Sequence, residues 1–201
     1  MKKIYTLLAL TIGFSMNAQM DDNSANNNSA GTYAVAMGNG TTASGYNSTA
    51  MGSVTTASGN RSTAMGYGAT ASGTYSTAMG RITSASGGYS TAMGYGATAS
   101  GDSSTAMGFY TTAGGTISTA MGRYTIASDY SSTVIGQFNS SGSSATSASS
   151  FSTSAPAFVI GNGADSSNKS DAFKVMFNGD ATVSNDLTVS GDVVISSDAR
   201  L

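Results

Sequence analysis

The sequence contains no cysteine and no histidine, and only 9% of its 201 residues are charged. The absence of cysteine excludes disulfides and thiol catalysis, and the absence of histidine excludes a Ser-His-Asp triad. Zinc sites built on either residue are excluded for the same reason. The net charge of −2 does not indicate the basic surface that a nucleic-acid-binding protein needs. Because globular domains are usually about 25% charged, this composition is not that of an ordinary globular domain.

Glycine is abundant instead, with 26 residues, and much of it recurs at a fixed interval. A Met-Gly pair returns every 14 residues (51 − 37, 65 − 51 and so on), and the eighth copy is Ile135-Gly136. The seven Met-Gly pairs are Met37-Gly38, Met51-Gly52, Met65-Gly66, Met79-Gly80, Met93-Gly94, Met107-Gly108 and Met121-Gly122. An Ala-Ser-Gly signature keeps the same period and drifts to Ala127-Ser128-Asp129 at the end. Since a flexible linker has no reason to keep register, the period indicates stacked coils.

Each unit holds two short runs rich in threonine, such as residues 48–51 and 55–58. We expect Gly52 and Gly59 to separate these runs. Runs this short, bounded by glycine, are typical of strands joined by tight turns, and none is long enough for a helix. The predicted fold is therefore all-β, a narrow β-solenoid or β-roll with one coil per unit.

Side-chain alternation along a strand assigns residues to two faces. Thr49 and Met51 share one face, while Ser48 and Ala50 share the other. The Thr49 column begins at Val35, and we expect it to point inward. Alanine at nearly every copy of the Ala50 position indicates a crowded place, either the inside of the roll or a subunit axis. A coil with so little apolar surface gains too little, at about 25 cal/mol per Å², to offset ordering its residues at roughly 1.5 kcal/mol each. The sequence therefore predicts association of several chains.

The unit Ser-Thr-Ala-Met-Gly followed by Thr-Ala-Ser-Gly resembles the head repeat of YadA-like trimeric autotransporter adhesins, which reads roughly Ser-Val-Ala-Ile-Gly with the same period. The resemblance covers about residues 31–138, and Val35 and Ile135 carry the family's own residues. A displaced further copy is present at Phe158-Val159-Ile160-Gly161. The resemblance implies a left-handed parallel β-roll, assembled as a tight homotrimer that serves as an adhesive head at the cell surface.

The first 18 residues have the pattern of a secretory signal peptide, with Lys2 and Lys3 before an apolar stretch at 4–14 and a cut after Ala18. This stretch is too short to span a membrane, and the alternative is a buried first helix. We expect an exported protein, secreted or associated with the outer membrane at the cell surface, without direct membrane insertion of this chain. Residues 19–30 hold few groups to bury, which predicts a flexible leader.

The C-terminal third changes character. Residues 139–156 are rich in serine and predict an insertion or linker that interrupts the last coil. In residues 157–201, Phe173, Val175 and Phe177 alternate with other residues before Asn178-Gly179, which predicts a hairpin. Two further short strands are predicted at 187–189 and 193–195.

The region from Asn178 onward resembles the β-rich neck that precedes the intramolecular chaperone of phage tail fibres and related bacterial surface proteins. The last six residues resemble the opening of that chaperone. In that family the chaperone trimerises the chain and then cuts itself off between a Ser and an Asp, so the resemblance implies a processing bond between Ser197 and Asp198. The chain stops at Leu201, before the Lys of the family motif. We expect a fragment or a processed form without peptidase activity.

One column of variable residues suggests a ligand-binding surface. The residues that follow the repeat glycine from the third to the seventh copy are Tyr67, Arg81, Tyr95, Phe109 and Arg123. Stacked coils lie about 4.8 Å apart, so these side chains are expected to form a ladder at one turn. Aromatic residues and arginine are enriched at binding hot spots, which predicts contact with a matrix or glycan ligand. The alternative is that they stack on one another or pack between subunits. Tyr46, Tyr75, Tyr89 and Tyr130 are expected at the opposite turn.

The sequence offers little catalytic chemistry. Its aspartates are scattered or lie beside turn glycines, where they usually close turns. Asp180, Asp186 and Asp192 recur every six residues, and we interpret them as turn residues between short strands rather than as a metal site. We therefore predict no catalytic residue, no metal site and no cofactor, and a binding protein rather than an enzyme.

Two alternatives to an adhesin head stay open. The first is a tail-fibre-like spike in which the array only spaces a distal partner. The second is ice binding through flat threonine arrays. The candidates for that array are the Thr49 column with Thr42, Thr56, Thr70, Thr98 and Thr112. An inward Thr49 column and bulky Tyr and Arg residues at the turns count against it.

Overall fold

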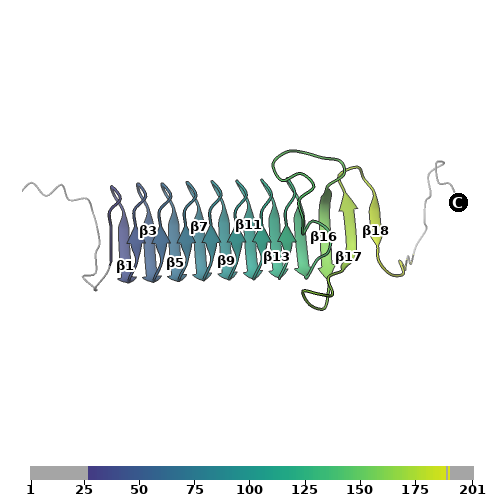
Figure 1. Cartoon of the computed structure of the whole chain (residues 1–201), viewed down its shortest axis with the longest axis horizontal. Coiled ribbons are helices and arrows are strands. Elements are labelled where there is room, and N and C mark those ends of the chain that lie inside the picture. The colour runs from purple at the N-terminus through teal and green to yellow at the C-terminus, as the bar shows by residue number, and fades with distance from the viewer. Residues whose placement is uncertain (1–26, 189, 191–201) are drawn as a thin grey trace, which may run out of the picture.

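The structure is a computed structural model that describes residues 27–188 and 190. These residues form 18 strands in two sheets. Within this described part there is no helix, and so none long and apolar enough to cross a membrane. The predicted signal peptide, most of the predicted leader, the strand predicted at 193–195 and the Ser197–Asp198 bond lie outside it. Figure 1 shows the strands side by side along the long axis of the molecule.

The larger sheet contains the five-residue strand of each repeat. These strands are β1 (Val35–Asn39), β3 (Thr49–Ser53), β5 (Thr63–Tyr67), β7 (Thr77–Arg81), β9 (Thr91–Tyr95), β11 (Thr105–Phe109), β13 (Thr119–Arg123) and β15 (Thr133–Gln137). Neighbours are parallel, and each residue pairs with its equivalent in the next repeat, as Met51 does with Met65.

The smaller sheet contains a two-residue strand from each of the first seven repeats. These strands are β2 (Thr42–Ala43), β4 (Thr56–Ala57), β6 (Thr70–Ala71), β8 (Ser84–Ala85), β10 (Thr98–Ala99), β12 (Thr112–Ala113) and β14 (Ile126–Ala127). They are also parallel and in register, as Thr56 pairs with Thr70. The prediction of an all-β parallel solenoid is confirmed, since one long and one short strand make each coil.

Small side chains line the interior of the roll. Ala50 of the long strand and Ala57 of the short strand are fully buried, as are their equivalents in the other coils. Thr49 and Met51 are only half-buried, because alternation turns them to the outer face of the larger sheet. The expectation that the Thr49 column points inward is therefore wrong. The narrow interior accepts the alanine and serine positions, and the larger side chains lie outside.

The repeat glycines have two different roles. Gly59 lies in a turn, as expected, whereas Gly52 lies inside strand β3 rather than between strands. Its φ of +120° is one that L side chains rarely adopt, and a Cβ at this position would lie 2.1 Å from the carbonyl oxygen of Gly66. The close approach of successive coils therefore requires glycine in this column.

Asparagine side chains and the serine-rich segment cover the two ends of the smaller sheet. At the N-terminal end the Asn27 side chain accepts the Thr41 N–H at 3.0 Å just before β2, and Asn28 pairs with Thr42. At the C-terminal end the Asn139 amide both donates to and accepts from the backbone of Ile126, each at 2.8 Å. Such contacts occupy backbone groups that these edges would otherwise present to a second sheet.

The last strands extend the larger sheet. Strand β16 (Pro156–Asn162) is parallel to β15 and pairs Phe158 with Thr133, in agreement with the displaced repeat copy. Strands β17 (Asp171–Met176) and β18 (Ala181–Val183) then form the predicted antiparallel hairpin. Leu187 and Thr188, predicted as a strand, have no strand structure. The segment between β15 and β16 leaves the stack and returns to it (Figure 1).

Candidate functional site

The five residues of the predicted ladder lie in one column at the end of the long strands. Tyr67 pairs with Arg81, Arg81 with Tyr95, and Phe109 with Arg123. The guanidinium of Arg81 lies 5.7 Å from the ring centre of Tyr67 and 5.2 Å from that of Tyr95. The rings of Tyr95 and Phe109 stack at 5.1 Å. The parallel register therefore brings together residues that are one repeat apart.

A second column lies directly beside the ladder and was not predicted from the sequence. Its members follow the ladder residues by one position, and their backbone φ is positive. They are Val54, Ile82, Tyr110, Tyr124 and Phe138, and the other copies have glycine at this position. Tyr110 stacks on Tyr124 at 5.2 Å, and Tyr124 stacks on Phe138 at 4.8 Å. The sequence does show that Tyr110, Tyr124 and Phe138 are spaced 14 residues apart, which could have predicted this column. Glycine at alternate earlier copies concealed the pattern.

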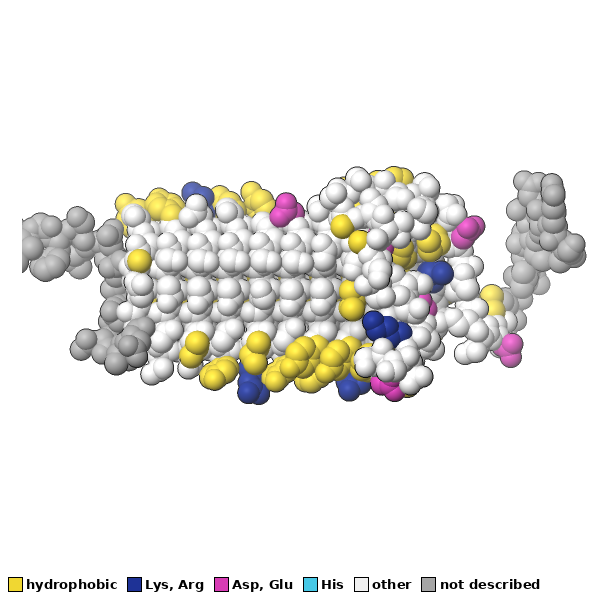
Figure 2. Space-filling view, viewed as in Figure 1, with side chains coloured by type: hydrophobic (Ala, Val, Ile, Leu, Met, Phe, Trp, Pro, Cys, Tyr) yellow, Lys and Arg dark blue, Asp and Glu magenta, His cyan; other side chains and the backbone are white. Residues whose placement is uncertain are grey.

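Together the two columns form what we call the aromatic edge, from Tyr67 to Phe138. Figure 2 shows it as a row of hydrophobic side chains interrupted by Lys or Arg, along the border of the molecule where the long strands end. The Arg123 guanidinium lies 4.9 Å from the Phe138 ring centre and 5.3 Å from that of Tyr124. Within the described residues, neither Arg81 nor Arg123 forms an ion pair.

Two tyrosines of the aromatic edge influence each other. The rings of Tyr95 and Tyr110 meet edge to face at 5.1 Å. A hydrogen bond with Tyr95, with additional effects of burial and of the neighbouring phenols, raises the pKa of Tyr110 above its ordinary value. Its hydroxyl therefore stays neutral at physiological pH and provides both a donor and an acceptor.

An apolar pocket, which we call the slot, lies at the C-terminal end of the aromatic edge. It has a volume of about 280 Å³. Its walls are Tyr110, Thr112, Tyr124, Ile126 and Phe138, with Ser166 and Lys169 from the loop between β16 and β17. A slot of this size accepts one small ring or side chain, and Lys169 gives it a cationic wall.

The opposite turn carries a separate aromatic group. Arg61 lies 5.5 Å from the Tyr46 ring centre and 5.1 Å from that of Tyr75, and Tyr75 stacks on Tyr89 at 5.0 Å. Tyr130 has no ring contact within the described residues and instead donates its backbone N–H to the Ser147 carbonyl. The structure thus brings together three of the four tyrosines predicted for this turn.

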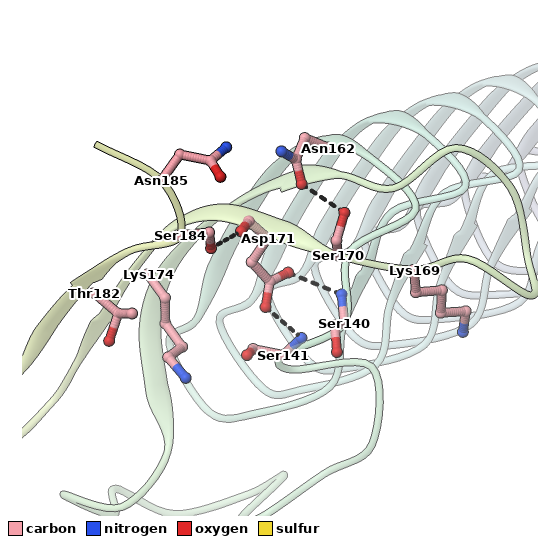
Figure 3. A pocket seen from close by; sticks show the side chains of 10 residues that line it. All are labelled: Ser140, Ser141, Asn162, Lys169, Ser170, Asp171, Lys174, Thr182, Ser184 and Asn185. Carbon is pink, nitrogen blue, oxygen red and sulfur yellow. Dashed lines mark hydrogen bonds between the residues drawn. The ribbon is translucent and has the colours of Figure 1, made fainter. Parts of the chain in front are cut away.

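A polar cavity of about 520 Å³ lies where the larger sheet meets the serine-rich segment. Figure 3 shows Asp171 at its centre, with Lys174 on one side of it and Lys169 on the other. Both carboxylate oxygens of Asp171 accept backbone N–H groups, from Ser140 at 2.8 Å and Ser141 at 2.9 Å. Asp171 therefore fixes the segment to the sheet, and its carboxylate is not free for acid–base chemistry.

Asp165 and Asp180 also have structural roles. Asp165 accepts bonds from the Ser167 N–H and from the backbone and side chain of Asn168, and the side-chain bond is the main cause of its lowered pKa. Asp180 closes the β17–β18 turn with Asn178. No cluster of three or more possible metal ligands occurs among the described residues.

The comparisons with known proteins agree with this geometry. The YadA head domain repeat family matches residues 29–54, 57–81 and 85–111. No curated protein matches the chain. The matched segments coincide with the coils from β1 to β11, in which every repeat glycine stands at the position where successive backbones approach most closely. The three matched segments are therefore similar to YadA head repeats, and the structure folds them as a parallel β-roll.

Proposed function

We propose that this protein is a non-catalytic adhesin head, exported to the cell surface and assembled as a homotrimer. The observation that carries the proposal is the outer face of the larger sheet, where a methionine of each repeat lies half-buried beside a threonine. The YadA head repeats support the adhesin class.

Self-association follows from where the apolar surface lies. The interior holds alanine, serine and threonine, so each coil buries little apolar area on its own. The methionine side chains are the largest apolar groups that recur from coil to coil, and they point out of the roll. Covering this column with equivalent sheets of two further copies removes it from water and provides the stabilisation that a single coil lacks. We also propose that the coils of the roll wind in the left-handed sense.

The aromatic edge is proposed as the surface that contacts a matrix or glycan ligand. Tyr67 and Phe109 are 52% and 41% exposed, although large aromatic side chains are usually buried. Exposed aromatic and arginine side chains in one row are the composition of binding hot spots. A purely structural spike has no need of such a row, since the backbone ladders already hold the coils in register.

Ice binding is a second candidate because of one observation. Thr42, Thr56, Thr70, Thr98 and Thr112 lie in register in the smaller sheet and are half-buried. The outward direction of the Thr49 column also removes one of the two arguments against this function. A thermal-hysteresis assay tests it directly: growth of ice as soon as the solution is cooled below the melting point, with no hysteresis gap, excludes it.

The mass of the secreted chain in solution tests the main proposal. Light scattering is expected to give three times the chain mass, together with a β-rich circular dichroism spectrum. A folded monomer contradicts the trimeric head and favours a self-sufficient solenoid. An unfolded monomer contradicts the proposal that these residues assemble by themselves.

A further inference from the structure

The rings of the aromatic edge turn their faces to one another. The interplanar angle is 14° between Tyr95 and Phe109, 12° between Tyr110 and Tyr124, and 10° between Tyr124 and Phe138. With ring centres about 5 Å apart, these faces leave no room for a sugar ring or a base between them. What the row presents to solvent is ring edges and tyrosine hydroxyls. The edge of an aromatic ring carries partial positive charge.

Cations add to this positive character. Arg81 and Arg123 are exposed within the row, and Lys169 lines the slot at its end. Asp165 lies on the same loop as Lys169 and accepts the N–H groups of Ser167 and Asn168, so its negative charge offsets one of these cations. The whole chain has a net charge of −2, so this concentration of positive charge is local. Charge complementarity therefore indicates an anionic ligand.

The second column of the aromatic edge has a left-handed backbone, as does the opposite turn. Ile82, Tyr110 and Tyr124 have φ values of 56°, 51° and 52°, in the left-handed region. Gly40, Gly68 and Gly96 occupy the same column without strain. A residue other than glycine in this region costs roughly 1–2 kcal/mol, and Arg61, Tyr75 and Tyr89 at the opposite turn carry the same cost, so the strain alone does not distinguish the aromatic edge.

We propose that the aromatic edge binds an acidic, uronate-bearing polysaccharide that runs along the axis of the roll. This inference rests on the proposed function as a binding head and names its ligand. A straight row that repeats at every coil, about 4.8 Å apart, matches a linear polymer with a repeating unit better than the irregular surface of a protein. Carboxylates suit the planar guanidinium of Arg81 and Arg123, and Tyr95 and Tyr110 offer hydroxyls to sugar hydroxyls.

The slot beside Lys169 is the proposed end site for one acidic sugar unit. Tyr124 and Phe138 give it apolar walls, and Arg123 and Lys169 are the cations nearest to those walls. The carbon-bound hydrogens of the sugar ring lie against the apolar wall, and its carboxylate lies toward the cations. A neutral sugar of the same shape makes only the first of these contacts.

The experiment compares the binding of the full secreted protein to polygalacturonate and to the same polymer after methyl esterification, which removes the charge and keeps the backbone. We expect binding to the acid form only, weakened by salt. Arg123→Gln and Lys169→Gln are each expected to lower the affinity at least roughly tenfold, the scale of one charge-assisted hydrogen bond. Arg61→Gln is the matched control, because Arg61 lies between two tyrosines at the opposite turn. Lys169 is on an exposed loop, so its replacement leaves the roll intact.

The outcomes separate this inference from the proposed function. Equal binding to both polymers, or an equal loss in the Arg61→Gln variant, overturns the proposed site. A trimer that adheres to matrix proteins but not to polygalacturonate also overturns it and leaves the adhesin function standing. A protein that binds neither class of ligand contradicts both. Loss of acid-polymer binding in Lys169→Gln, with an unchanged trimer mass and an unaffected Arg61→Gln control, supports the inference.

Discussion

The ring of Tyr110 lies over Gly96 of the preceding coil, where a Cβ would be 2.6 Å from Tyr110 Cδ1. Gly68 has the same backbone conformation, with φ of +63° against +64°, but a Cβ there meets only Ile82 Cγ1 at 3.8 Å. Glycine in this column therefore has two uses. It avoids left-handed strain, and at Gly96 it also gives the tyrosine ring a place to lie.

This difference predicts unequal effects of the same substitution. Gly68→Ala and Gly96→Ala both introduce left-handed strain of about 1–2 kcal/mol. Only Gly96→Ala also displaces the Tyr110 ring from Tyr95, with a further loss of about 1 kcal/mol expected for an aromatic pair. Thermal unfolding followed by circular dichroism measures both. Equal losses of stability in the two variants contradict the conclusion that Gly96 makes room for the Tyr110 ring.

A second prediction concerns Asp129, which stands where the preceding repeats have glycine. In those repeats the next coil leaves no space, as a Cβ at Gly101 would lie 2.0 Å from the Gly115 carbonyl oxygen. No regular turn stacks on Asp129, and its Oδ1 accepts the N–H groups of Thr146 at 2.5 Å and Ser147 at 2.7 Å. Asp129→Ala is expected to release the serine-rich segment, with loss of roughly 1.5–3 kcal/mol for hydrogen bonds to a charged group.

Limited proteolysis within residues 140–155 measures this release. Asp129→Asn retains an acceptor oxygen and is expected to behave nearly as the unmodified chain does. Asp102→Ala serves as the control, because the exposed Asp102 carboxylate accepts only the Gly88 N–H. If Asp129→Ala is cleaved no faster than Asp102→Ala, the carboxylate does not hold the segment.

The pKa of Tyr110 gives a third prediction. Because the folded state raises this pKa, Tyr110 contributes stability that is fully present below the ordinary tyrosine pKa of 10.0 and is lost as the pH rises through the folded value. The main cause is the hydrogen bond with Tyr95, so Tyr95→Phe is expected to lower the pKa of Tyr110. Tyrosinate absorbance during an alkaline titration reports the change. Tyr46→Phe, at the opposite turn, is expected to leave the midpoint of Tyr110 unchanged, and an equal shift in both variants contradicts the coupling.

The 14-residue period was sufficient to predict the parallel coils, because strict spacing of glycine has a direct physical cause in the backbone approach at positions such as Gly52 and Gly66. The direction of the two faces was not predictable from alternation, which separates Thr49 from Ala50 without telling which side is inside. The column of Tyr110 and Tyr124 was missed because its left-handed backbone is a property of the folded turn. The bond from Ser140 to Asp171 joins residues 31 positions apart, and no local pattern indicates such a contact.

The methionine column provides the last prediction. Met79 lies on the outer face of β7, in the middle of the array, and is half-buried in the single chain. Met79→Asp is expected to leave the packing inside the coil undisturbed, because the side chain already points away from the interior. In the proposed trimer it places an unpaired carboxylate from every chain at the interface, and burying such a charge costs several kcal/mol per ion. Light scattering is therefore expected to show dissociation to monomers. Ser72→Asp adds the same charge at an exposed position just after β6 in the smaller sheet and is expected to preserve the trimer mass. Trimers that persist in Met79→Asp, or that dissociate only in Ser72→Asp, place the interface elsewhere than on the outer face of the larger sheet.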